Sequence, residues 1–349
     1  MIRTLPRQTV AEPTKRAKPR RFAWAMLAAL LLLAQAGCQR GPLPPAGSLK
    51  KLTIGVSTWP GSAALYVARE KGFFRDAGLD ATLVAYESGH LALDDALSGK
   101  VDLATASETP IAAAVLEGQP AAIVVTLAYV DRSIVIVGRR DHGITAASDL
   151  RGKRVAVTRG TAGDFFLHIY LTTSYIDPAD VSIVDLPADE LPAALADGDV
   201  DAICSWAPYA TTAQEDLGPT AIVLDEPGLY TTTWNLVAAR DLLTRNPDVV
   251  IRALRAIVRA NEYIVAHTSE TLDIVARDVG MDTSTLQAQW PNFELTAELD
   301  QELILSLEDE ARWLASSNEA SGTPPNFLDY IDVDSLRAVQ PEAVRIIGR

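Results

Sequence analysis

The chain has 349 residues, 48% of them hydrophobic and 22% charged, which is enough to bury a sizeable core in about two domains. Residues 1–37 carry seven Lys or Arg and one Glu, which leaves 24 basic and 44 acidic residues afterwards, a formal balance of −20. Because a body this acidic repels nucleic-acid phosphates and anionic lipid surfaces, we expect no nucleic-acid partner.

The first 37 residues are typical of an export signal. A basic segment ends at Arg21, an apolar run covers residues 22–34, and Gln-Ala-Gly-Cys occupies residues 35–38. The apolar run is too short for a secure transmembrane span. Residues 35–38 resemble the bacterial lipobox, whose cysteine is acylated after cleavage. We therefore expect a lipoprotein signal peptide over 1–37 and lipidation at Cys38, with plain secretion as the alternative.

The Pro/Gly-rich residues 38–50 predict a tether that holds a folded body off a membrane. After the tether, short apolar segments alternate with helix-like segments, which predicts sheets of mainly parallel strands. The expected strands are 52–57, 81–86, 101–105, 121–127, 133–137, 154–158, 181–185, 200–204, 221–224 and 231–238. The expected helices are 63–75, 91–97, one from Pro110, one after Gly163, 249–266 and 297–314, and the chain should be almost wholly helical from Arg240 onward.

One pattern occurs twice, about a hundred residues apart. Residues 94–110 and residues 193–208 both run from a helix end through Gly and Val-Asp to a short apolar strand, a polar or aromatic tip and Pro. Gly99 and Gly198 stand where a helix C-terminus needs a residue that tolerates positive φ. Two similar α/β units predict two lobes.

The chain order predicts how the lobes are assembled. We expect residues 51–134 to form the first part of lobe 1, residues 135–234 to form lobe 2, and residues 235–349 to return to lobe 1 as its helical part. The two crossovers, near 133–137 and 231–238, would act as a hinge. The expected fold is therefore a two-lobed α/β protein with a cleft, which is a preferred place for a ligand.

Four loops follow predicted strands and run into helix starts, so their residues should meet at the cleft. Helix N-termini offer unpaired N–H groups and a partial positive charge, which suit a small anion. Flat indole rings could clamp the same ligand. The candidate ligand-binding residues are Trp59, His90, Ser107, Glu108, Thr109, Gly160, Thr161, Ala162, Gly163, Asp164, Trp206 and Trp234.

Some of these residues have a structural alternative. Ser62 and Thr109 could simply cap helices, and Pro110 suits a first helical position. Glu108 and Asp164 could either interact with a helix dipole or pair with a ligand amine. The tryptophans could pack the lobes together instead of clamping a ligand.

Other chemistries lack sequence support. Only Cys38 and Cys204 are present, so no disulfide framework is available, and the four histidines show no metal-ligand spacing. Residues 160–163 lack the Lys-Ser/Thr ending of a P-loop. No catalytic constellation is recognisable, so we expect a protein that is not an enzyme and that carries no metal and no cofactor.

Five segments together resemble a known family. Residues 51–79, 96–110, 148–163, 198–209 and 322–336 are similar, in order, to the periplasmic binding proteins of ABC importers for aliphatic sulfonates, taurine and nitrate. The resemblance implies a type 2 periplasmic binding fold and a ligand site between the lobes. It also implies a monomer that captures a small polar solute in the periplasm, anchored to a membrane at Cys38, and delivers it to an ABC permease and its ATPase.

The resemblance leaves several alternatives open. Relatives with the same architecture bind pyrimidine precursors of thiamine, and a sensory or assembly lipoprotein could use the same two-lobed body without import. The sequence does not decide which ligand binds, or which membrane holds the anchor.

Overall fold

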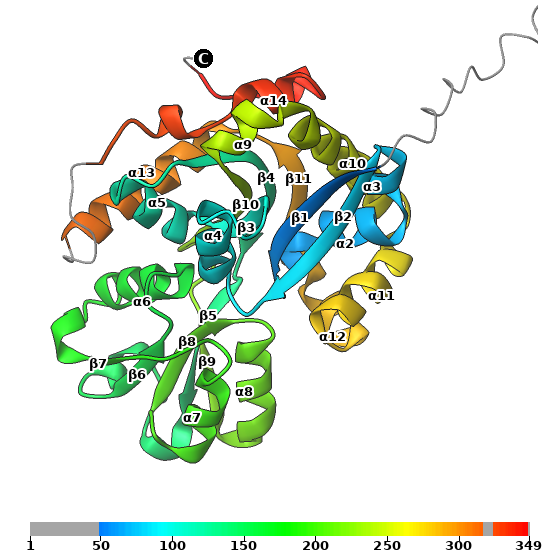
Figure 1. Cartoon of the computed structure of the whole chain (residues 1–349). Helices are drawn as coiled ribbons and strands as arrows, with labels where there is room; N and C mark the ends of the chain where they lie inside the picture. The colour runs from blue at the N-terminus through cyan, green and yellow to red at the C-terminus, as the bar shows by residue number, and fades with distance from the viewer. Residues whose placement is uncertain (1–48, 317–323, 348–349) are drawn as a thin grey trace, which may run out of the picture. The chain divides into compact units, whose positions relative to one another are not determined.

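The computed structural model describes residues 49–316 and 324–347. The predicted signal peptide, Cys38 and all of the predicted tether except residues 49 and 50 lie outside the described residues. Among the helices of the described part, none combines the length and the hydropathy that crossing a bilayer requires. The described residues form an α/β structure with two separate sheets, which confirms the predicted fold class (Figure 1).

The first sheet has six strands in the order β11-β4-β10-β3-β1-β2. Their bounds are β1 Lys50–Ser57, β2 Leu79–Tyr86, β3 Leu103–Ser107, β4 Ala121–Asp131, β10 Thr231–Ala239 and β11 Phe293–Glu298. β1 pairs in parallel with β2 and β3, whereas β10 and β11 run antiparallel to their partners. The later strands thus join a sheet that the start of the chain begins: β10 lies between β4 and β3, and β11 lies at the edge beside β4.

The second sheet has five strands in the order β7-β6-β8-β5-β9. Their bounds are β5 Ile134–Arg139, β6 Arg154–Val157, β7 Ser182–Asp185, β8 Ala202–Trp206 and β9 Ala221–Leu224. β6 is parallel to β7 and β8, and β5 is antiparallel to β8 and β9. Both sheets are mixed rather than mainly parallel, because the strands next to the crossovers, β4, β5, β9 and β10, make antiparallel pairs.

Helices cover both sheets (Figure 1). The helices that lie between strands of the first sheet or follow it are α2 Ala63–Glu70, α3 Phe73–Asp76, α4 Gly89–Leu97, α5 Glu108–Leu116, α9 Arg240–Arg245, α10 Pro247–Ala266, α11 Thr268–Val279, α12 Thr283–Gln289, α13 Gln301–Ser316 and α14 Val333–Arg337. The second sheet carries α6 Ala162–Thr173, α7 Leu191–Asp197 and α8 Tyr209–Leu217. Each sheet has its own buried apolar cluster, as expected of amphipathic helices packed on strands.

The chain passes between the sheets twice. It leaves the first sheet after Asp131 and enters the second at Ile134, and it returns between Leu224 and Thr231. The predicted hinge segments therefore lie mostly in strands, because 231–238 lies wholly in β10 and 133–137 lies in β5 except for Ser133. Two contacts tie the passages together: Arg132 Nη2 lies 2.8 Å from Asp225 Oδ2, and the Ser133 and Thr232 hydroxyls are 2.8 Å apart.

Several local expectations need correction. The predicted helix 63–75 is divided into α2 and α3 because Gly72 adopts a φ of +72°. β11 was not predicted, since residues after Arg240 were expected to be almost wholly helical. The predicted φ of Gly99 and Gly198 is confirmed, at +80° and +79°.

Two predicted helix starts also differ from the structure. The Ser62 side chain does not cap α2, because its hydroxyl accepts the Trp234 indole N–H. Pro110 is the third residue of α5 rather than the first, because the helix already begins at Glu108.

Candidate functional site

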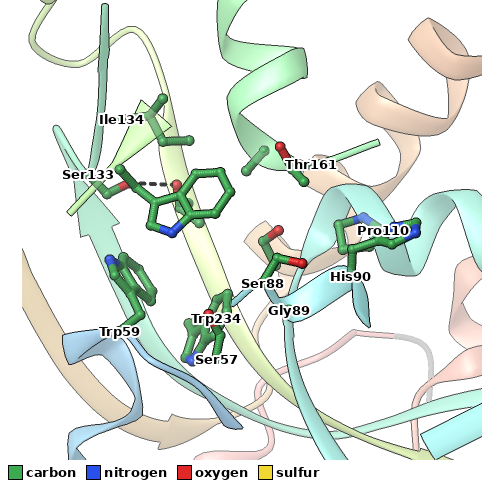
Figure 2. Close-up of a pocket in the computed structure, with 14 residues that line it drawn as sticks. Ser57, Trp59, Ser88, Gly89, His90, Pro110, Ser133, Ile134, Thr161 and Trp234 are labelled. Atoms are coloured by element: carbon green, nitrogen blue, oxygen red, sulfur yellow. Dashed lines mark hydrogen bonds between the residues drawn. The ribbon is translucent and has the colours of Figure 1, made fainter. Parts of the chain in front are cut away.

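A narrow cavity lies where elements of both sheets meet (Figure 2). The space open to the centres of water molecules is about 40 Å³, which is room for a few waters. Its lining comes from strand carboxyl ends, helix starts and the passages between the sheets. The lining residues are Ser57, Trp59, Ser88, Gly89, His90, Ser107, Pro110, Ser133, Ile134, Thr161, Ala162, Trp206, Thr232 and Trp234.

Three helices begin at this cavity. Ser88, Ser107 and Thr161 occupy the N-cap positions of α4, α5 and α6, and all three line the cavity. Ser107 makes no side-chain capping bond, and the Thr161 hydroxyl donates to the Thr158 carbonyl at 2.7 Å. The first N–H groups of a helix carry partial positive charge and have no intrahelical partner. The cavity therefore lies at the N–H ends of three helices, although no Lys or Arg is among its described lining residues. Glu108 and Asp164, in the first turns of α5 and α6, offset part of the positive charge of these ends.

Two tryptophans form a rigid wall on the first sheet. The rings of Trp59 and Trp234 meet edge to face, with centroids 4.7 Å apart, and Phe293 packs on Trp59 at 5.5 Å. The Trp234 Nε1–H donates to Ser62 Oγ at 2.9 Å, which fixes the indole. Figure 2 shows Trp59 and Trp234 close together at the cavity. These rings offer a flat apolar surface of fixed position.

Trp206 belongs to the other sheet. It ends β8, is only partly buried, and packs edge to face on Tyr209 with centroids 5.9 Å apart. Because it lines the same cavity as Trp59 and Trp234, indoles from both sheets border one space.

His90 is the one titratable side chain among the described lining residues. Its Nε2 lies 3.5 Å from Asp94 Oδ2, and its Nδ1 is shielded from solvent without a hydrogen-bond partner in the described part of the chain. A methyl group added at Gly160 would come within 3.7 Å of the His90 ring. His90 from α4 therefore lies against the loop that precedes α6.

The cavity brings together seven of the twelve candidate residues. These are Trp59, His90, Ser107, Thr161, Ala162, Trp206 and Trp234. The other five, Glu108, Thr109, Gly160, Gly163 and Asp164, are not among its lining residues. Their predicted role in binding stays a prediction.

Glu108, the first residue of α5, is fully buried and is not among the lining residues. Its carboxylate accepts from the Tyr230 hydroxyl at 2.6 Å and from the Thr233 amide at 3.1 Å. The Tyr230 hydroxyl is also 3.1 Å from Glu310 Oε1. Because the phenol has one proton, both contacts are hydrogen bonds only if one carboxyl donates.

Burial sets the protonation of this acidic pair. It raises the pKa of Glu108 to about 7 although the bonds from Tyr230 and Thr233 lower it. Burial, followed by the charge of Glu108, raises the pKa of Glu310 well above its usual range. Glu310 is therefore the neutral member that donates to Tyr230, and the cluster links α5 to α13 through Tyr230.

The remaining candidates shape the loops around the cavity. Asp164 is buried and accepts the Gly160 N–H at 3.2 Å, which holds the turn that leads into α6. A methyl group at Gly163 would lie 3.5 Å from the Trp206 ring, in ordinary van der Waals contact, so Gly163 lies beside the indole. Thr109 is fully buried and is the second residue of α5, so it does not cap this helix, whose N-cap position is Ser107.

Several lining residues were missed. Ser57 is the last residue of β1 and Ser88 follows β2, so their position at strand carboxyl ends could have identified them. Ser133, Ile134 and Thr232 line the cavity because they lie at the passages between the sheets. Gly89 and Pro110 carry no side-chain chemistry that a sequence could reveal.

Neither Cys204 nor a metal-binding cluster of the described residues lies in the lining of the cavity. Cys204 is fully buried, its thiol donates to the Gly163 carbonyl at 3.2 Å, and burial raises its pKa well above the usual range. Among the described residues no group of three or more His, Cys, Asp or Glu is arranged to hold a metal ion.

Known proteins are similar to this chain in sequence and in fold. The NMT1/THI5-like family profile matches residues 59–271. A Bacillus subtilis protein named as an aliphatic sulfonates-binding protein is 27% identical over 316 residues, which cover 88% of this chain and 93% of that protein. A 2'-hydroxybiphenyl-2-sulfinate desulfinase of Rhodococcus erythropolis is 25% identical and covers 76% of this chain and 88% of its own length.

A solved structure extends the likeness to the fold. The periplasmic aliphatic sulphonate binding protein SsuA from Escherichia coli has a TM-score of 0.67 at 20% identity, and the match covers 81% of this chain and 97% of that one. The predicted two-lobed periplasmic binding fold is thereby confirmed. The desulfurization enzyme DSZB has a similar fold, with a TM-score of 0.60 at 20% identity, so binding proteins and an enzyme both occur on it. The family profile matches more than half of the sequence, and the chain belongs to the NMT1/THI5-like family.

Proposed function

We propose that this protein captures a small sulfonate-like solute in the cavity between its two sheets and delivers it to an ABC permease. The observation that carries the proposal is the meeting of three helix N-termini with indoles from both sheets. A sulfonate group has three oxygens that can accept N–H and O–H bonds, and its organic tail can lie on the indoles. The names of the relatives favour the same ligand class.

The size of the cavity favours capture by closure. The space open to water centres is only about 40 Å³ and its lining comes from both sheets, so a bound sulfonate would be held between the two lobes. We therefore infer that the lobes separate to admit the solute and close on it, with the two passages between the sheets as the hinge.

The cellular setting follows the sequence. We propose that the protein lies in the periplasm and is held at a membrane by an acylated Cys38. Residues 38–50 would then tether the folded body to this anchor. We propose that it acts as a monomer, which docks on the permease without a further subunit. Mass spectrometry of the membrane fraction should find a diacylglyceryl group on Cys38, and a freely soluble protein cleaved elsewhere would contradict this part.

A ligand screen tests the proposal. The Tm of the full-length protein should rise with alkanesulfonates or taurine, since a ligand at 100 times its Kd adds about 2.7 kcal/mol of stability. Sodium chloride at equal ionic strength should not raise the Tm. Calorimetry should then give one site per chain. Stabilisation by pyrimidines alone would transfer the proposal to the pyrimidine-binding relatives.

The desulfinase relative makes catalysis a separate outcome of the same screen. Release of sulfite from 2'-hydroxybiphenyl-2-sulfinate at a steady rate would show that this chain is an enzyme. We expect no sulfite, because the described lining offers hydroxyls, one imidazole and indoles rather than a reactive thiol. If a sulfonate binds but a permease-deficient strain still imports it normally, a sensory role would replace import.

A further inference from the structure

A second, acidic groove lies outside the cavity described above. It has a volume of about 630 Å³ and is bordered by β4, β10, β11 and the start of α13. Its charged lining consists of Asp131, Glu294, Glu298, Asp300, Glu302 and Arg345. None of these residues lines the cavity between the sheets.

Arg345 neutralises only part of this charge. Its guanidinium lies 2.6 Å from Glu298 Oε1 and 3.0 Å from Asp300 Oδ2. No cation pairs with Glu294, Glu302 or Asp131 among the described residues. The pKa of Glu302 is raised by partial burial and by repulsion from Asp300, Glu294 and Glu298, as expected where the local potential is negative.

Two buried polar atoms of the groove have no partner. Tyr129 is 8% exposed, and its hydroxyl, which faces the carboxylates of Glu298, Asp300 and Glu302, makes no hydrogen bond in the described part of the chain. Asp131 Oδ1 is likewise shielded and unbonded there. Buried polar groups are normally satisfied, so these two atoms indicate a missing partner.

We propose that this groove binds a small organic cation bearing ammonium groups, such as a di- or polyamine. An ammonium group can donate to Asp131 and to the Tyr129 oxygen at once, and further ammonium groups can reach Glu294 and Glu302. The volume suits a molecule of several atoms rather than a bare metal ion.

The groove adjoins the passages between the sheets. Asp131 and Thr231, which pair directly, are the last residue of β4 and the first of β10. Phe293, another lining residue, packs on Trp59 of the sulfonate cavity at 5.5 Å. A cation bound here therefore contacts the segments on which the lobes would turn.

Calorimetry with spermidine and putrescine on the full-length protein tests the proposal at fixed ionic strength. Spermidine should bind saturably at one site, and the double variant Glu294→Gln with Glu302→Gln should weaken it at least 10-fold. The matched control is Glu215→Gln with Asp216→Asn, which removes the same charge from α8 and should change the affinity less than 2-fold.

A second pair of variants tests the hydroxyl. Tyr129→Phe should weaken spermidine binding about 5-fold, and Tyr175→Phe, at an exposed tyrosine, should not. Thermal unfolding of each variant shows whether it folds. No saturable binding at millimolar spermidine, an equal loss in the charge-matched control, or displacement of spermidine by an equal concentration of Mg²⁺ would overturn the proposal.

Discussion

Three tryptophans border the candidate cavity, but their surroundings differ. Trp59 and Trp234 are almost wholly buried and pack on each other, so they also hold the first lobe together. Trp206 is only partly buried and has space beside it. Removal of Trp206 should therefore affect binding more than folding.

We predict that Trp206→Ala weakens binding of the sulfonate found by the screen by about 1–3 kcal/mol, in line with loss of an aromatic hot spot. Titration calorimetry measures this directly. Trp290→Ala is the control, because Trp290 lies outside the cavity lining. An unchanged affinity in a folded Trp206→Ala protein would place the ligand elsewhere.

A single hydroxyl supports the tryptophan wall. The buried Ser62 Oγ accepts the Trp234 Nε1–H at 2.9 Å. We predict that Ser62→Ala lowers the free energy of unfolding by about 1–3 kcal/mol, since it leaves a buried indole N–H unsatisfied. Urea unfolding measures the loss. Ser98→Ala, at an exposed helix end, should cost less than 0.5 kcal/mol or so, and equal losses would contradict this account of Ser62.

The roles of single residues were harder to predict than their positions. The strand-then-helix pattern located Ser107, Thr161 and Trp206 because strand carboxyl ends meet at one edge of a sheet. It could not tell that Glu108 turns into the core, because that depends on Tyr230, which is 122 positions away in the sequence. For the same reason, the sequence could not show that Ser62 accepts a hydrogen bond from Trp234.

At the level of elements, periodicity found most strands and helices but not β11. Phe293–Glu298 has two glutamates and a half-exposed pattern, so it lacks the apolar run of a central strand. It forms because it pairs with the edge of β4. Long-range pairing of this kind, like the order of the strands, has no local signal in the sequence.

The contact between α5 and α13 should make stability depend on pH. Burial raises the pKa of Glu108 to about 7 and that of Glu310 well above the usual range, so the folded state holds protons that the unfolded chain releases near pH 4 to 5. Because the folded state binds more protons than the unfolded chain, the free energy of unfolding falls as the pH rises from about 4.5 through 7 and beyond.

We predict that Glu310→Gln makes the free energy of unfolding depend less on pH. Above pH 7 the variant should be more stable than the wild type, because the amide keeps a donor without a buried charge. Urea unfolding from pH 5 to pH 9 measures the effect. Glu308→Gln, on the same helix and outside the cluster, should keep the wild-type slope. Parallel slopes for the wild type and Glu310→Gln would contradict the assignment.

At the scale of the whole folded body, two sheets are joined by two short passages. Arg132, at the first passage, adopts a φ of +55° and pairs with Asp225 of the second. The Tyr209 hydroxyl donates to the Glu87 carbonyl at 3.1 Å, a contact between elements of different sheets. Phe165 of α6 also packs on Trp313 of α13, with ring centroids 5.3 Å apart. A closing motion about the two passages would rearrange these contacts.

We predict that the bound protein is more compact than the free protein. Small-angle X-ray scattering should give a smaller radius of gyration with a saturating sulfonate. Trp206→Ala at the same sulfonate concentration should show a smaller change, because fewer molecules are occupied. Equal radii at proven saturation would mean that binding does not close the lobes.

The central claim is that a sulfonate binds in the cavity between the sheets, and anomalous diffraction from crystals grown with 2-bromoethanesulfonate tests it most directly. We predict a bromine peak beside Trp206, with the sulfonate oxygens at the N-termini of α5 and α6. A bromine peak only outside this cavity, in crystals of protein shown by calorimetry to bind the compound, would contradict it.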